Sequence, residues 1–235
     1  MKLLLETQQL CEQYLKKVRQ DPEHQLSFIE KDAIYISFQP ASFDFPERNK
    51  KDNSQTFDQN LENNFQKMNL GDHTLSWLGI LTVSNVLSRW ETTVKRKGKW
   101  QKQYIKEIKY LLQDTGDLLL GKLVFQEAKE RLSELYWYFS HNLVKADLGY
   151  MNDAAIYMFS VAIYGGNKYE VADDAVTAYT IIDRNKPGAT ELLAPPLPFE
   201  YDLNKRLEFW EWWLTEAIPQ AWELANRTYT KRERP

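Results

Sequence analysis

The stretch that most constrains this chain lies near its end, where FWEWWLTEAIPQAW runs from Phe209 to Trp222 and holds four of the eight tryptophans. Large aromatic side chains dominate the energetics of cores and interfaces, because each removes roughly 150–250 Å² from water. The rest of the chain must therefore either bury this stretch or leave it to bind a partner.

At about 100° per residue, the terminal segment has one broad apolar face and one polar face. The apolar arc, expected in the core, contains Leu207, Trp210, Trp213, Leu214, Ala217, Ile218, Ala221, Leu224 and Ala225. Trp212 falls on the other face, where it either packs under the proline-rich crossing at 187–203 or anchors a binding surface. Pro219 predicts a kink, because it cannot donate a backbone hydrogen bond to the carbonyl of Thr215.

The remaining periodicity predicts an all-α fold, a single bundle of seven or eight helices within one domain over residues 1–235. Residues 1–21 form an N-terminal helix, residues 22–70 an irregular, loop-rich segment, and residues 72–226 the helical core. Ile34–Phe38 could be a short strand inside the irregular segment.

Several helix boundaries follow from residue type. Asp72 is expected to cap a long central helix from His73 to about Arg96. Glycine at positions 116 and 149 is expected to separate later helices, and Gly165-Gly166 to end one of them.

Composition limits the class of protein. Hydrophobic residues make up 43% of the chain and aromatic residues 14%, so a packed core is expected and global disorder is excluded. A single cysteine, Cys11, excludes an internal disulfide and a cysteine-based zinc site, and we expect it to be a buried, inert thiol. The leucines near Met1 are too few for a signal-peptide core, and no apolar run is long enough to span a membrane, so a cytoplasmic protein is expected.

Charge is distributed unevenly. Residues 71–146 contain 12 basic and 8 acidic residues, whereas residues 147–226 contain 5 basic and 13 acidic residues. Such a distribution can steer an oppositely charged partner. The candidate contact surface for a basic partner comprises Asp173, Asp174, Glu208, Glu211, Glu216, Glu223 and Trp212.

Residues with catalytic potential are sparse, and none of the usual nucleophile, phosphate-binding or zinc motifs occurs. An alternative is a helical metal-dependent hydrolase that uses His141, Asp147 and Asp153, although the Glu-x-x-His pairs that a helical di-metal site requires are missing. We therefore expect no metal, no cofactor and no enzymatic activity. The basic run from Lys95 to Lys109 follows helical spacing opposite apolar residues, which is typical of a solvated face, so no nucleic-acid partner is expected.

Four segments together resemble a known family. The pattern R-x-x-FWxWWLxxAIPxAW, here Arg206 to Trp222, resembles the C-terminal signature of an all-α family of immunity proteins from bacterial polymorphic toxin systems. NVLSRWE (85–91), LLLGKL (118–123) and YMNDAAIYMFSVAI (150–163) are similar to further segments of that family and occur in the same order. The resemblance covers roughly residues 72–226, with Ser88-Arg89 where the family pattern has Pro-Leu.

The resemblance implies a cytoplasmic protein that binds and neutralises a cognate toxin, for example a basic nuclease domain. It brings no catalytic residues with it, and it says nothing of the oligomeric state. A non-enzymatic structural adaptor without a toxin partner is the remaining alternative.

Overall fold

The computed structural model describes residues 3–40, 62–93, 99–140, 146–165, 168–182 and 200–232. In these ranges the expected all-α architecture is confirmed, with one isolated antiparallel bridge between Ile181 and Tyr201. The elements are α1 (Leu5–Gln20), α2 (Phe28–Ser37), α4 (Leu70–Thr93), α5 (Lys99–Leu119), α6 (Phe125–Ser140), α7 (Ala146–Tyr164), α8 (Glu170–Thr180), α9 (Leu203–Trp212), the π-helical turn η1 (Trp213–Ala217) and α10 (Ile218–Arg232).

The described part thus contains nine α-helices where seven or eight were expected. One extra helix, α2, lies in the segment expected to be loop-rich, and the expected strand at Ile34–Phe38 is wrong. Ser27 caps α2, because its side chain accepts a bond from the amide of Glu30 while Glu30 accepts one from the amide of Ser27. This reciprocal capping favours a helix over the extended form that the β-branched residues suggested.

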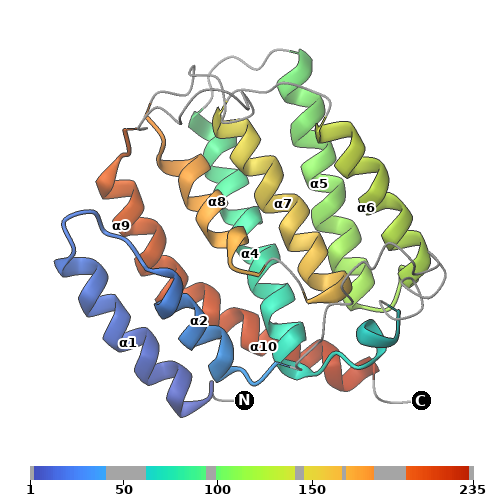
Figure 1. Ribbon diagram of the computed structural model, residues 1–235, viewed down its shortest axis with the longest axis horizontal. Coiled ribbons are helices and arrows are strands. Elements are labelled where there is room, and N and C mark those ends of the chain that lie inside the picture. Colours follow the sequence, from blue (N-terminus) through green and yellow to red (C-terminus); the bar gives the residue numbers. More distant parts are fainter. Residues whose placement is uncertain are drawn as a thin grey trace, which may run out of the picture.

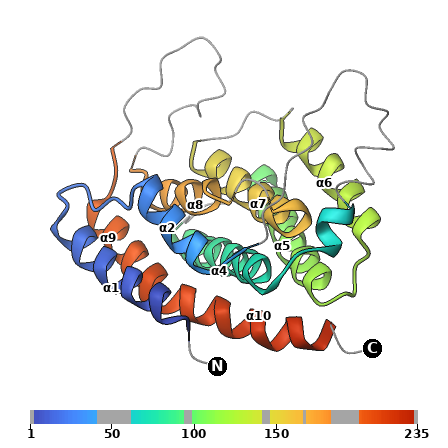
Figure 2. The same cartoon turned by 60° about the horizontal axis from the view of Figure 1, so that its bottom comes forward.

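Helix α4 occupies the centre of the bundle. It contacts α5, α7 and α8 on one side and α10 on the other, and α9, η1 and α10 together run along the length of the molecule (Figures 1 and 2). The expected cap at Asp72 is wrong, because Asn69 caps the helix: its side-chain oxygen accepts bonds from the amides of Gly71 and Asp72 at 2.8 and 3.2 Å. Asp72 returns the bond by accepting from the amide of Asn69 at 2.8 Å.

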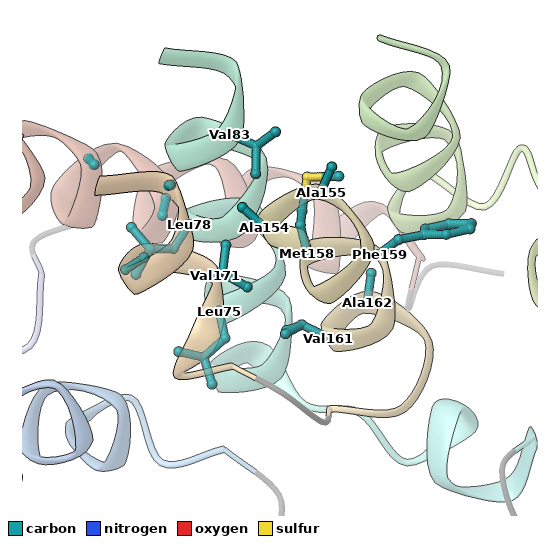
Figure 3. Packing of buried hydrophobic residues seen from close by; sticks show 14 of the residues in the cluster. Leu75, Leu78, Val83, Ala154, Ala155, Met158, Phe159, Val161, Ala162 and Val171 are labelled. Carbon is teal, nitrogen blue, oxygen red and sulfur yellow. The ribbon is translucent and has the colours of Figure 1, made fainter. Parts of the chain in front are cut away.

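Small side chains let α7 approach α4 and α8 closely. Ala154, Ala155 and Ala162 are fully buried on α7 (Figure 3). A Cβ placed on Gly79 of α4 would lie 3.1 Å from Cγ of Met158. The expected breaks at Gly116 and Gly149 are wrong, because α5 continues past Gly116 and α7 begins before Gly149. Glycine costs only about 1 kcal/mol inside a helix, which packing on α4 can offset.

The terminal segment confirms the predicted core face. Most of the apolar arc is buried, with Leu207 and Leu224 half-buried. The irregularity expected near Pro219 is a π turn, η1, in which the amide of Ile218 bonds to the carbonyl of Trp213. A π turn is a common way for a helix to absorb a disrupted hydrogen-bond ladder.

Candidate functional site

Trp212 is less exposed than a dedicated binding anchor would be. Its side chain is half-buried and packs against the edge of the core, with its ring centroid 6.0 Å from that of Phe209. Most of the crossing at 187–203 that was expected to cover it, residues 187–199, lies outside the described residues. Only the exposed part of Trp212 can therefore contact a partner.

Three of the glutamates expected to form an acidic surface are paired with arginines of the same chain. Glu208 pairs with Arg89 of α4, and Glu211 accepts a bond from Nε of Arg19 on α1 at 2.6 Å. Glu223 pairs with Arg227 one turn along α10. The first two arginines lie more than 100 residues away in the sequence, so counting charge by segment could not reveal the compensation.

Glu216 differs from its neighbours. It is exposed, and it has no ionic partner among the residues that the structure describes. At this position the negative charge is available to a partner without breaking an internal ion pair.

The two aspartates of the expected surface lie on α8 and differ in environment. Asp173 pairs with Lys31, whose side chain is 2% exposed, while the carboxylate itself is 50% exposed. Asp174 is partly buried, and burial followed by repulsion from Asp153 and Asp173 raises its pKa to about 8. At neutral pH it is therefore largely protonated and contributes little negative charge.

The structure thus divides the seven expected contact residues into two groups. Trp212 and the four glutamates lie on the terminal helix, whereas Asp173 and Asp174 lie on α8. Tyr179 of α8 links the two helices, because the cationic groups of Arg89 and Lys205 lie 5.5 and 5.8 Å from its ring centroid. Two cationic side chains therefore lie close to Tyr179 between these helices, and one of them, Arg89, also pairs with Glu208.

The alternative hydrolase site falls mostly on residues that the structure does not describe. His141 lies outside the described ranges, and so does the side chain of Asp147, while Asp153 is exposed on α7. Within the described ranges, no three His, Cys, Asp or Glu side chains form a group that could hold a metal.

A pocket that no sequence pattern indicated lies where the α1–α2 connection meets α8 and the start of α9. Its volume is about 290 Å³, and Lys31, Asp173, Tyr201, Arg206 and Trp210 contribute to its walls. Lys31 and Arg206 are 2% and 4% exposed. Buried lysine and arginine are rare. The sequence did not single them out, because Glu30 and Asp32 flank Lys31 and Lys205 precedes Arg206.

No protein-family model and no curated protein sequence matches this chain. None of the described helices combines the length and the apolar character needed to cross a membrane.

Proposed function

We propose that the chain is an immunity protein that binds a cognate bacterial toxin in the cytoplasm and occludes it without turnover. The observation that carries this proposal is the resemblance of Arg206–Trp222 to the terminal signature of such proteins. Most of the large side chains of this motif are buried, so the motif is a determinant of the fold. Contacts with a toxin would therefore be made by the exposed residues of the terminal helix, most of which lie between the motif positions.

The outer face of the terminal helix is the proposed contact surface. Glu216 offers a carboxylate that has no ionic partner within the described ranges, and Glu208, Glu211 and Glu223 form ion pairs that are at least partly exposed. Exposed ion pairs contribute only about 0–1 kcal/mol each, so cationic groups of a toxin can replace the internal arginines at small cost. The half-buried edge of Trp212 would add an apolar contact among these charges.

A basic toxin, for example a nuclease domain, suits this surface. Complementary charge mainly accelerates association and selects the partner, while occlusion of the toxin's active cleft would give neutralisation. Asp174 contributes little to such steering near pH 7, because its raised pKa keeps it mostly protonated.

The decisive experiment is co-expression with the product of the adjacent gene. We expect that product to arrest growth when expressed alone, and the full chain to restore growth and to co-purify with it. A neighbour without toxicity, or a toxic neighbour that the chain neither binds nor neutralises, would contradict the proposal.

The contact surface is tested separately by charge reversal. Glu216→Lys should slow association with the toxin, and the triple variant with Glu208→Lys and Glu211→Lys should slow it further. The control is Glu130→Lys, which changes an exposed carboxylate on α6. Association rates equal to wild type in the triple variant would show that the toxin binds elsewhere on the molecule.

A further inference from the structure

The pocket beside α9 contains a positive charge that the protein compensates poorly. Arg206 is 4% exposed, and its guanidinium stacks on Tyr201 with its carbon 4.0 Å from the ring centroid. Both of its polar contacts use Nη1, which lies 3.3 Å from the carbonyl oxygen of Glu23 and 3.9 Å from that residue's carboxylate. The carboxylate of Glu23 is 67% exposed, so water screens most of its attraction.

The other edge of this guanidinium is available for binding. Nε and Nη2 of Arg206 have no acceptor among the residues described. Stacking on Tyr201 covers one face of the guanidinium plane but leaves its in-plane N–H groups accessible. A guanidinium edge of this kind matches the two oxygens of a carboxylate.

The remaining walls define the charge and the character of a ligand. Lys31 is already paired with Asp173, and its Nζ lies 5.9 Å from the ring centroid of Trp210. The charged side chains of the described wall, Lys31, Asp173 and Arg206, together carry one net positive charge, which matches a monoanion. Leu26, Phe28 and Val176 provide apolar wall.

A further observation concerns the charge state of Arg206. Burial lowers the pKa of the Arg206 guanidinium, because its removal from water outweighs the opposing effects of Tyr201 and Glu23. The charge of this buried cation is only partly balanced by other groups of the protein. Binding of an anion would therefore stabilise it.

We propose that this pocket, which is lined by residues of the α1–α2 connection, α2, α8 and α9, binds a small organic carboxylate with an aromatic or aliphatic body. The carboxylate bonds to the Nε–Nη2 edge of Arg206, and the body lies against Phe28 and Val176. A volume of about 290 Å³ is at the small end of ligand pockets, which suits one ring or a short chain. The site goes beyond the proposed function and stands without it.

The test is calorimetric titration of the full chain with benzoate, with inorganic phosphate and benzylammonium as comparison ligands. We expect saturable one-to-one binding of benzoate and no saturable binding of benzylammonium. Arg206→Gln should weaken benzoate binding by about tenfold or more, since charged hydrogen bonds contribute about 1.5–3 kcal/mol. Arg206→Lys should also weaken it, because lysine keeps the charge but lacks the two-pronged edge.

The matched control is Arg131→Gln, which removes a guanidinium that is paired with Asp114 and Glu127 outside the pocket. This variant should bind benzoate like wild type. Thr177→Leu serves as a second probe, because it fills part of the pocket without changing a charge; it should weaken benzoate binding even if the Arg206 variants do not fold.

Three outcomes would overturn the proposal. They are no saturable benzoate binding by wild type at millimolar concentrations, unchanged affinity in a folded Arg206→Gln variant, or tighter binding of phosphate than of benzoate. Circular dichroism of each variant establishes that it is folded before its affinity is compared.

Discussion

Trp213 donates its indole N–H to the hydroxyl of Thr82 at 3.1 Å, and this buried bond ties the terminal helix to the central helix α4. The hydroxyl in turn donates to the carbonyl of Leu78 at 2.7 Å, so its position is fixed. Trp213 is fully buried, and its ring also meets that of Tyr35 edge-on at 6.1 Å. One tryptophan of the terminal motif thus joins α2, α4 and η1.

Replacing Thr82 with valine removes this acceptor while keeping the shape of the side chain. The indole N–H of Trp213 would then be buried without a partner, which costs about 1–3 kcal/mol. We expect the free energy of unfolding, measured in urea, to fall by that amount. Thr82→Ser is the control: it keeps the hydroxyl and should retain the hydrogen bond, so a loss as large as that in Thr82→Val would assign the effect to packing instead.

Two glycines of the long helices respond oppositely to alanine. A Cβ on Gly71 would lie 2.5 Å from the carbonyl oxygen of Phe38 and 2.8 Å from the nitrogen of Pro40, both backbone atoms that cannot move aside alone. Gly71→Ala should therefore destabilise the protein by at least about 1–3 kcal/mol. A Cβ on Gly116 meets nothing within 4 Å.

Gly116→Ala should accordingly stabilise the protein by up to about 1 kcal/mol, because alanine has the higher helix propensity. Thermal unfolding of the two variants beside wild type measures both effects. Equal melting temperatures for the two variants would show that α4 and the end of α2 do not approach as closely as described.

Cys11 provides a chemical test of the packing of α1. Burial, assisted by the negative charge of Glu12, raises the pKa of its thiol to about 12. Since the thiolate is the reactive form, modification by a disulfide reagent at pH 8 should be slow in the native protein and rapid in denaturant. Fast native labelling would mean that α1 detaches readily from the bundle.

Helical periodicity was sufficient to predict the apolar face of the terminal helix, because nearly every residue of the arc from Leu207 to Ala225 packs inward. It failed at α2, where β-branched residues suggested a strand and the capping pair Ser27–Glu30 decides for a helix. Residue type led us to expect the cap of α4 at Asp72 and not at Asn69. Aspartate and asparagine are equally good N-caps, so residue type alone does not decide between two positions three residues apart.

The candidate contact surface could be predicted only in part. The terminal helix does carry glutamates on its outer face, but their partners Arg19 and Arg89 come from distant helices. The pocket could not be predicted from the sequence for the same reason. Lys31 and Arg206 stand far apart in the sequence, and only the folded chain brings them to one cavity. Charge counts along a sequence do not record such pairings.

Asp174 makes the stability of the protein depend on pH. Burial, with repulsion from Asp153, Asp173 and Glu170 and partial relief from Lys31, raises its pKa to about 8. An acid whose pKa is higher in the folded chain than in the unfolded chain binds more protons when folded, so deprotonation disfavours folding. The contribution of Asp174 is therefore most favourable below about pH 4, the unfolded pKa, and is lost as pH rises from about 4 to about 8.

Asp174→Asn should remove this dependence and raise the free energy of unfolding above that of wild type at pH 8. Urea unfolding at several pH values between 4 and 8 measures the slope for both proteins. The control is Glu6→Gln, which changes an exposed carboxylate on α1 and should keep the wild-type slope. If wild type and Asp174→Asn lose stability in parallel over this range, the titrating group lies elsewhere and Asp174 is ionised in the folded protein, where it would add to the negative charge available to a basic partner.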